Sequence, residues 1–182
     1  MIFFDKKGKI NTSETVEITV KRAKELGIKH LVVATCSGET GKKFIGCGLN
    51  LVCVSHHIGY KSPGEDELSA ETRLLFQKEG VIVLTTTHLL AGVDRALRFK
   101  YQGIYSAEII ADTLRMFGQG AKVCIEIAVM ALDAGLIPYG EEIVAIGGTG
   151  VGADTGMVLI PDHSSKIFNT NIKEIICMPR GH

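Results

Sequence analysis

The sequence predicts an α/β fold in which a mostly parallel sheet forms the middle layer of a three-layer αβα sandwich. Apolar runs of strand length, such as His30 to Thr35 and Val81 to Thr86, are typical of strands buried on both faces of a parallel sheet. Helical stretches with an apolar stripe separate these runs, and glycine often follows them where a helix would end. Strands that alternate with helices at short spacing favour right-handed βαβ units.

The predicted elements follow one another closely along the chain. Asn11 to Glu14 matches a capping box before the first helix, and Gly27 stands where that helix would end. We expect strands at residues 2–4, 30–35, 49–55, 81–86, 143–147, 157–160 and 173–178, and helices at residues 15–26, 40–47, 66–79, 92–99, 106–117 and 121–134.

Composition limits the function classes. At 182 residues the chain fits one domain, residues 1–182, with a well-buried core. Apolar residues make up 46% and charged residues 22%, close to the average for soluble globular proteins, which argues against a disordered or fibrous chain. Twenty acidic and twenty basic side chains cancel, so the charge balance predicts no nucleic-acid or membrane partner and favours a small molecule.

Cysteine usage predicts a cytoplasmic protein. The five cysteines are an odd number without CxxC spacing, and most stand in apolar surroundings, as reduced core residues do. The apolar residues after Met1 precede the first lysines and are too few for a signal peptide, and no apolar run reaches membrane-spanning length.

The stretch from Val32 to Gly41 predicts a buried strand that leads into a turn rich in glycine and hydroxyl groups. A helix that starts just after a strand presents unpaired backbone N–H groups, which favour an anion such as phosphate. Ser37 and Thr40 add hydroxyl donors, and Gly38 allows the backbone to approach a ligand closely. The same Ser-Gly-x-Thr pattern also makes an ordinary helix cap, so both interpretations stay open at this point.

The order of the strands predicts where a ligand would bind. A sheet that grows outward through three strands and then crosses back by a long helical stretch must place residues 143–147 on the free side of residues 30–35. Ligands of open α/β sheets bind outside the carboxyl ends of the strands at such a topological switch point. We therefore expect the two flanking loops, Thr35 to Gly41 and Gly147 to Gly156, to meet in space.

The run from Ser13 through Thr40 resembles the carboxy-terminal domain of pyruvate kinases. In that family a Thr-x-Ser-Gly-x-Ser/Thr motif closes round an effector phosphate, and Thr35-Cys-Ser-Gly-Glu-Thr40 matches this motif. The second internal strand and the glycine loop also correspond, so the resemblance covers about Thr12 to Ile160. The chain is still more similar to free-standing, mostly archaeal proteins of this fold, a largely uncharacterised family in which some members bind FMN.

The resemblance implies phosphate contacts at Thr35, Ser37, Gly38 and Thr40, with Gly147 to Gly152 as the facing loop. It implies no kinase chemistry, because the catalytic barrel of pyruvate kinase has no counterpart in the sequence. Pyruvate kinases that bind a sugar bisphosphate carry a Trp-Arg-Pro stretch in the facing loop. That loop has neither tryptophan nor arginine here, which puts a second phosphate site in doubt.

The ligand-binding residues that we expect all belong to loops at one edge of the sheet. The glycine-rich loop contains a GxGxxG-like fragment, but it precedes a strand, so a Rossmann fingerprint fails its context test. A ligand-binding wall and a plain flexible turn both stay open for it, and Asp154 suits either a ribityl hydroxyl or a turn cap. The predicted site residues are Thr35, Cys36, Ser37, Gly38, Thr40, Gly41, Thr87, His88, Gly147, Gly148, Thr149, Gly150, Val151 and Gly152.

Three histidines follow predicted strands at the same edge. His56, His57 and His88 would lie near Cys36, a combination of side chains that zinc also uses. No pair of them has zinc spacing on a single element, so the sequence predicts no metal site. Cys36 is interpreted either as an activated thiol near a helix start or as a small residue that fills a turn.

Two groups of charged residues are predicted to face solvent. Arg95, Arg98 and Lys100 are interpreted as a solvated face, with a phosphate contact as the alternative. Glu126 and Asp133 stand seven residues apart on an otherwise apolar helix, so we expect them to share its exposed face. No order of Ser, His and Asp and no carboxylate pair indicates a particular reaction.

These observations together predict a protein that binds FMN or a related phosphorylated small molecule at the switch point. In a flavoenzyme the protein would orient the isoalloxazine and the flavin would carry the chemistry, but whether the chain is an enzyme stays open. The alternatives are a sensor or regulatory module for a phosphorylated metabolite and a purely structural oligomerisation unit. We expect a homo-oligomer, because the apolar helix around Val123 to Leu132 is difficult to cover on all sides in a monomer.

Overall fold

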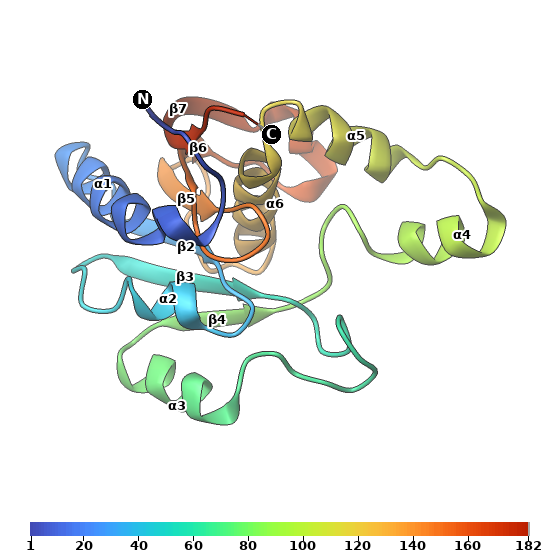
Figure 1. The fold of residues 1–182 in the computed structure, drawn as a ribbon, viewed down its shortest axis with the longest axis horizontal. Coiled ribbons are helices and arrows are strands. Elements are labelled where there is room, and N and C mark those ends of the chain that lie inside the picture. Colours follow the sequence, from blue (N-terminus) through green and yellow to red (C-terminus); the bar gives the residue numbers. More distant parts are fainter. Residues whose placement is uncertain (182) are drawn as a thin grey trace.

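The computed structural model describes residues 1–181, in which seven strands form one sheet with helices against both faces (Figure 1). Each strand lies within two residues of its predicted range. The strands are β1 (Ile2–Phe4), β2 (His30–Ala34), β3 (Asn50–Ser55), β4 (Ile82–Thr85), β5 (Ile143–Gly147), β6 (Thr155–Ile160) and β7 (Asn171–Pro179).

The helices differ more from the prediction than the strands do. The helix predicted at residues 40–47 is only four residues long, because residues 43–47 form i to i−3 turns that lead to Gly46 at a φ of 75°. No helix among residues 1–181 is long and apolar enough to cross a bilayer. The α-helices are α1 (Thr12–Glu25), α2 (Glu39–Lys42), α3 (Ala70–Lys78), α4 (Val93–Tyr101), α5 (Ser106–Arg115) and α6 (Gln119–Asp133), and the 3₁₀ helices are η1 (Lys9–Asn11) and η2 (Ser164–Asn169).

The predicted capping box is wrong. Asn11 occupies the N-cap position of α1, but its side-chain amide donates to Lys6 O and makes no cap hydrogen bond. The Thr12 hydroxyl donates to Lys9 O at 2.8 Å, so the chain enters α1 through η1. The prediction for the other end is correct, since α1 is followed by Gly27 at a φ of 70°.

The sheet has the strand order β1-β7-β6-β5-β2-β3-β4. Strand β5 pairs parallel with β2, with Val32 opposite Ala145, so the switch point lies where the sequence predicts it. Strand β6 is antiparallel to both β5 and β7, whereas β1, β2, β3 and β4 have parallel neighbours. The sheet is therefore mixed and mostly parallel, as predicted.

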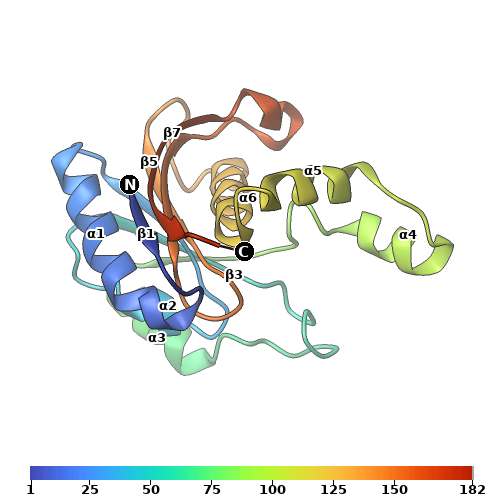
Figure 2. The ribbon, with the colours of Figure 1, turned by 45° about the horizontal axis from the view of Figure 1, so that its top comes forward.

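Two apolar layers hold the helices on the sheet. One layer packs Ala23 of α1 and Phe76 of α3 against strand residues such as Val33. The opposite layer packs α6 against the alternate strand residues, including Val32 and Ala145. Figure 2 shows the result, with α1, α2 and α3 on one side of the sheet and α6 on the other. This is the three-layer αβα sandwich.

Helix α6 does not leave an apolar face in solvent, so the reason given for self-association does not hold for it. Its residues from Gly120 to Leu132 are buried except Val123, because the sheet and α5 cover it within one chain. Exposed apolar side chains occur on several elements, and a group of them lies on α4, α5 and their connection, which project from the body in both views (Figures 1 and 2). They include Val93, Phe99 and Ile104, which is 84% exposed.

Candidate functional site

An open cavity of about 1190 Å³ lies beyond the carboxyl ends of β2 and β3. Both loops of the predicted site line it, as the switch-point argument requires. Helices α4, α5 and α6 border the remaining side. The predicted residues that line the cavity are Thr35, Cys36, Ser37, Thr40, His88, Gly148, Gly150, Val151 and Gly152, and those that do not are Gly38, Gly41, Thr87, Gly147 and Thr149.

The first loop, residues 35–41, has unused hydrogen-bond donors. Gly38 is the N-cap of α2 with a left-handed φ of 92°, and as a glycine it has no side chain to cap this end. Within residues 1–181 the backbone N–H groups of residues 36–40 donate to no acceptor, whereas Gly41 N donates to Thr35 Oγ1 at 3.4 Å. Neither the Ser37 nor the Thr40 hydroxyl accepts one of these N–H groups, so the interpretation of the Ser-Gly-x-Thr pattern as an ordinary helix cap is wrong. A polar ligand in the cavity would find these donors free.

The glycines of the first loop have a packing role. A β-carbon on Gly38 would collide with Thr72 Cγ2, and one on Gly41 would stand 2.6 Å from Cys53 Sγ and 2.9 Å from the Phe76 ring. Both positions face the protein, which explains why neither residue lines the cavity. These glycines let the loop lie close against α3 and β3, which in turn fixes where its N–H groups point.

The second loop, residues 147–156, is held by its own hydrogen bonds. Fully buried Asp154 accepts from Gly8 N at 2.7 Å, from Thr149 N at 3.2 Å and from the Thr155 hydroxyl at 2.8 Å. The Thr12 hydroxyl accepts from the N–H of Ala153 at 3.1 Å. Asp154 thus stabilises the turn, and the suggestion that it holds a ribityl hydroxyl is wrong because burial keeps it from the cavity.

Most glycines of the second loop are also required by packing. A β-carbon added at Gly148 would collide with Gly152 O, and one added at Gly152 would collide with the Thr12 hydroxyl. At Gly147 it would come within 2.6 Å of Gly120 O. Gly150 differs, since its β-carbon would meet nothing within 4 Å, but its φ is 75°. The high glycine content of this loop therefore reflects close backbone packing and the positive φ angles of Gly150 and Gly152.

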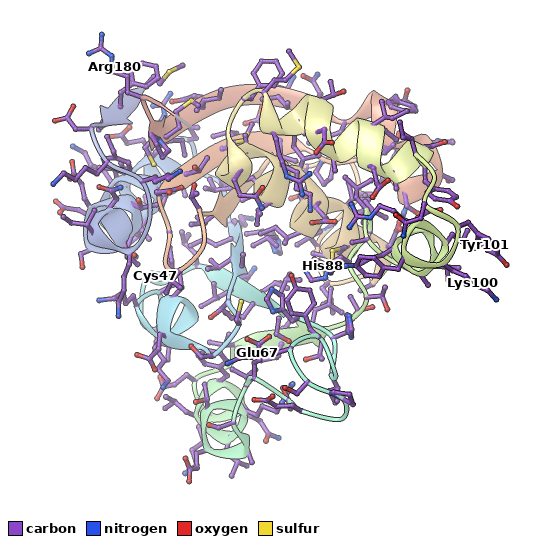
Figure 3. The ribbon with its side chains drawn as sticks, turned by 45° about the vertical axis from the view of Figure 1, so that its right-hand side comes forward. Cys47, Glu67, His88, Lys100, Tyr101 and Arg180 are labelled. Atoms are coloured by element: carbon purple, nitrogen blue, oxygen red, sulfur yellow. The ribbon has the colours of Figure 1, made fainter. Side chains whose placement is uncertain are left out.

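Polar side chains from the loops after β2, β3 and β4 meet in one part of the cavity. Cys36 Sγ lies 3.3 Å from His56 Nε2, and His56 Nδ1 lies 2.6 Å from Glu67 Oε2. The Tyr60 ring packs on His56 with centroids 3.8 Å apart, and the centroid of His88 is 5.0 Å from that of His56. Figure 3 shows Glu67 and His88 near this part of the cavity, with Cys47 apart from them beside α2.

Burial changes the acidity of two groups in this cluster. Burial, together with the negative charge of Glu67, raises the pKa of the Cys36 thiol to about 11. Burial lowers the pKa of His88 to about 4, against a weaker opposing effect of Glu126. At neutral pH the Cys36 thiol is therefore protonated and the His88 ring is neutral. The interpretation of Cys36 as a thiol already ionised in the resting protein is not supported.

The sequence predicts no metal ligands, yet the structure groups three potential donors. Cys36, His56 and Glu67 offer ligand atoms that all lie within 4.8 Å of one another. They come from loops after β2 and β3 and from the segment before α3, so spacing on one element could not reveal them. Because Glu67 already bonds to His56 Nδ1, the atoms that face each other are Cys36 Sγ and His56 Nε2.

The prediction for Glu126 is wrong. It is 1% exposed, forms an ion pair with buried Lys122 and accepts from Leu90 N at 2.8 Å. Asp133 is on the surface and bonds to His163 Nδ1 at 2.8 Å, so the two carboxylates do not share a face. An acidic residue four positions after a lysine on an apolar helix was the available signal for a buried pair.

Several cations line the cavity. Arg95 and Arg98 do so, which corrects their interpretation as a purely solvated face, although Arg98 pairs with Glu108 at 2.6 Å. Lys43, just after α2, and Lys9, whose backbone lies against Gly152 of the second loop, also line the cavity, and neither is in an ion pair within residues 1–181. Lys100 is not among the lining residues.

Comparison with known proteins finds one family. A family model described as the pyruvate kinase alpha/beta domain matches residues 13–160. A solved structure of pyruvate kinase from Cryptosporidium parvum is 14% identical, with a TM-score of 0.36 and coverage of 75% of this chain and 20% of that one. The same enzyme in complex with ADP gives 14% identity, a TM-score of 0.38 and coverage of 81% and 22%. This chain thus spans about a fifth of the length of these enzymes.

Proposed function

This chain belongs to the family of the pyruvate kinase alpha/beta domain, and we propose that it binds FMN or a related phosphorylated small molecule in the cavity at the switch point. The observation that carries the proposal is the row of unused backbone N–H groups at residues 36–40, all of which except Gly38 line the cavity. Consecutive N–H groups of this kind form an anion-binding concavity.

Side chains around the first loop add to this donor surface. Ser37 and Thr40 line the cavity with hydroxyl groups, which donate to phosphate oxygens. Lys9 and Lys43 bring positive charge; neither forms an ion pair within residues 1–181, although the charge of Glu39 on the same wall acts on both. A phosphate monoester accepts several hydrogen bonds and carries nearly two negative charges at neutral pH, so this loop offers it both donors and charge.

The part of the cavity around His56, which contacts Cys36 of the first loop, suits a flat ring system. His56, Tyr60 and His88 form an aromatic cluster there, with ring centroids 3.8 to 5.2 Å apart. Aromatic rings of this kind stack on a planar ligand, and the cavity of about 1190 Å³ has room for one. In this arrangement the ring system lies by the histidines and the phosphate by the first loop.

Absorbance of the purified protein and titration with flavins test the proposal. We expect FMN to bind at least about tenfold more tightly than riboflavin, because only FMN carries the phosphate that the loop would hold. The measurement is flavin fluorescence at constant ionic strength. Equal affinities for the two flavins would exclude a phosphate site at residues 36–40, and no binding of either flavin would direct the search to other phosphorylated molecules.

A regulatory module is the second candidate, and the position of α4 and α5 favours it. Arg95 and Arg98 line the cavity on the same helix that exposes Val93 and Phe99, so a ligand that orders this segment would also order an apolar surface. We propose that this surface makes the chain a homo-oligomer. Light scattering with and without FMN separates the cases, because a regulatory module changes its oligomeric state with ligand and a purely structural unit does not.

We also place the protein in the cytoplasm. All five cysteines are free thiols, which suits a reducing compartment.

A further inference from the structure

We propose that Cys36, His56 and Glu67 form a nucleophilic triad that transfers or hydrolyses acyl groups through a thioester on Cys36. The proposal concerns a catalytic activity and does not rest on the binding of FMN or of any phosphate. Its three members come from two loops, Cys36 from the loop after β2 and both His56 and Glu67 from the loop between β3 and α3, and all of them line the cavity.

The geometry is that of a nucleophile, a base and a residue that orients the base. Cys36 Sγ lies 3.3 Å from His56 Nε2, which is within hydrogen-bond reach for sulfur, and His56 Nδ1 lies 2.6 Å from Glu67 Oε2. An ionised carboxylate can only accept a hydrogen bond, so Nδ1 carries the proton and Nε2 is left as an acceptor. The acceptor nitrogen therefore faces the thiol, as a general base must.

The surroundings hold the base in place. The Tyr60 ring covers the His56 ring at a centroid distance of 3.8 Å, and Arg95 lies 5.7 Å from the centroid of Tyr60. His56 thus has a carboxylate at one nitrogen, a thiol at the other and an aromatic ring against its face. A histidine fixed in this way keeps one orientation, which general-base catalysis requires.

The thiol stays protonated until it reacts. Burial and the charge of Glu67 raise the pKa of Cys36 to about 11, so little thiolate exists at neutral pH. Proton transfer to His56 must then accompany attack, as it does for a serine nucleophile. This makes the reactivity of Cys36 depend on His56, and that dependence is measurable.

The reaction balances with water as the only co-reactant. Cys36 Sγ attacks the carbonyl carbon of an ester or thioester, its proton passes to His56 Nε2, and the carbonyl π electrons move onto oxygen. The adduct collapses when the bond to the leaving group breaks, and the leaving group takes the proton from His56. Water then attacks the thioester with His56 as base, which releases a carboxylic acid and returns the proton to Cys36.

Two backbone groups are available for the oxyanion. The N–H groups of Cys36 and Ser37 donate to no acceptor within residues 1–181 and belong to the residue of the nucleophile and its neighbour. Backbone donors of this kind stabilise the negative charge that develops on the carbonyl oxygen.

The test measures acylation of individual cysteines in the intact chain. The protein is incubated with p-nitrophenyl acetate, which has no phosphate, and the acetylated cysteines are quantified over time by peptide mass spectrometry. Cys47 is the internal control, because it is also a half-buried free thiol but has no histidine bonded to it among residues 1–181. We expect Cys36 to be acetylated about 100-fold faster than Cys47.

Variants separate the base from a structural role. We expect His56→Ala to lower the rate of Cys36 acetylation by about 100-fold and to leave the rate of Cys47 acetylation unchanged. Added imidazole should restore part of the rate at Cys36. Glu67 is a positioning residue, so Glu67→Gln should lower the rate of Cys36 acetylation by about tenfold, and Glu67→Asp should retain more of that rate than Glu67→Gln. Melting temperatures of all the variants confirm that they are folded.

Two results would overturn the proposed triad. Equal acetylation of Cys36 and Cys47 in the parent protein would overturn the proposal, and this comparison stands even where a variant fails to fold. An unchanged rate at Cys36 in folded His56→Ala would also overturn it. The probe lacks a phosphate, so a failed flavin titration would not count against the triad. Failure of Cys36 to react would likewise not count against FMN binding.

Discussion

The two loops that border the cavity are both rich in glycine, yet their backbones have different roles. In the loop at residues 147–156, the N–H groups of Thr149, Ala153 and Asp154 are bonded within the protein. In the loop at residues 35–41, five consecutive N–H groups have no partner within residues 1–181. Glycine content alone therefore indicates close packing, whereas unused donors indicate where a polar ligand would bind.

Replacing Asp154 should produce the largest loss of stability. Asp154→Ala leaves the N–H groups of Gly8 and Thr149 and the Thr155 hydroxyl without their buried acceptor, which we expect to cost about 3–5 kcal/mol. Urea unfolding measures this change. Ser37→Ala is the matched control in the first loop and should shift the free energy of unfolding by less than about 0.5 kcal/mol. Similar losses for both variants would contradict the contrast between the loops.

Two glycines of the second loop should respond differently to the same substitution. Gly148→Ala places a β-carbon against Gly152 O, and overpacking of the backbone should cost about 3 kcal/mol. Gly150→Ala meets no neighbour and should cost about 1 kcal/mol, because its φ of 75° is unfavourable for an L-residue. Thermal and urea unfolding of the two variants test the order. A larger loss at Gly150 would show that backbone strain outweighs packing in this loop.

The first loop should control affinity and leave stability largely unchanged. Thr40→Ala removes a hydroxyl donor from the cavity. The loss of one hydrogen bond to a charged group should lower the affinity for FMN by about tenfold to a hundredfold. Riboflavin lacks the phosphate, so its affinity should remain the same. Parallel flavin titrations of Thr40→Ala and the parent chain make the comparison. Equal weakening of both flavins would mean that Thr40 supports the fold of the loop.

The smallest effect concerns His88, which lines the cavity beside His56. Its folded pKa of about 4 lies below the unfolded value of 6.5, so the unfolded chain binds the extra proton first. Stability from this residue is complete above about pH 6.5 and falls as the pH drops toward 4. After allowance for the partial exposure of His88, we expect the free energy of unfolding to fall by about 1 kcal/mol over this range, which corresponds to a decrease of roughly 2–4 °C in melting temperature.

Comparison with His88→Asn isolates this effect. The asparagine variant does not titrate, so the difference in melting temperature between it and the parent should narrow or change sign between pH 8 and pH 5. A difference that is the same at both pH values would show that His88 is protonated equally in the folded and unfolded chains.

The sequence by itself determined the sheet and its switch point. Apolar runs such as Leu31 to Val33 can only be satisfied by burial on both faces, and the long helical crossover forces β5 to the free side of β2. These are properties of consecutive residues and of chain connectivity, which a linear sequence carries directly. The same reasoning brought the loops after β2 and β5 to one cavity.

Only the tertiary structure decided what the polar groups do. Glu126 is buried because Lys122 and Leu90 N satisfy it, and Asp154 holds the second loop because Gly8 N reaches it from 146 residues away. The bond between His56 and Glu67 likewise joins two residues eleven positions apart in one loop, and their spacing in the sequence does not reveal it. A polar side chain takes its role from partners that are distant in sequence, since burial is tolerated only where donors and acceptors meet in space.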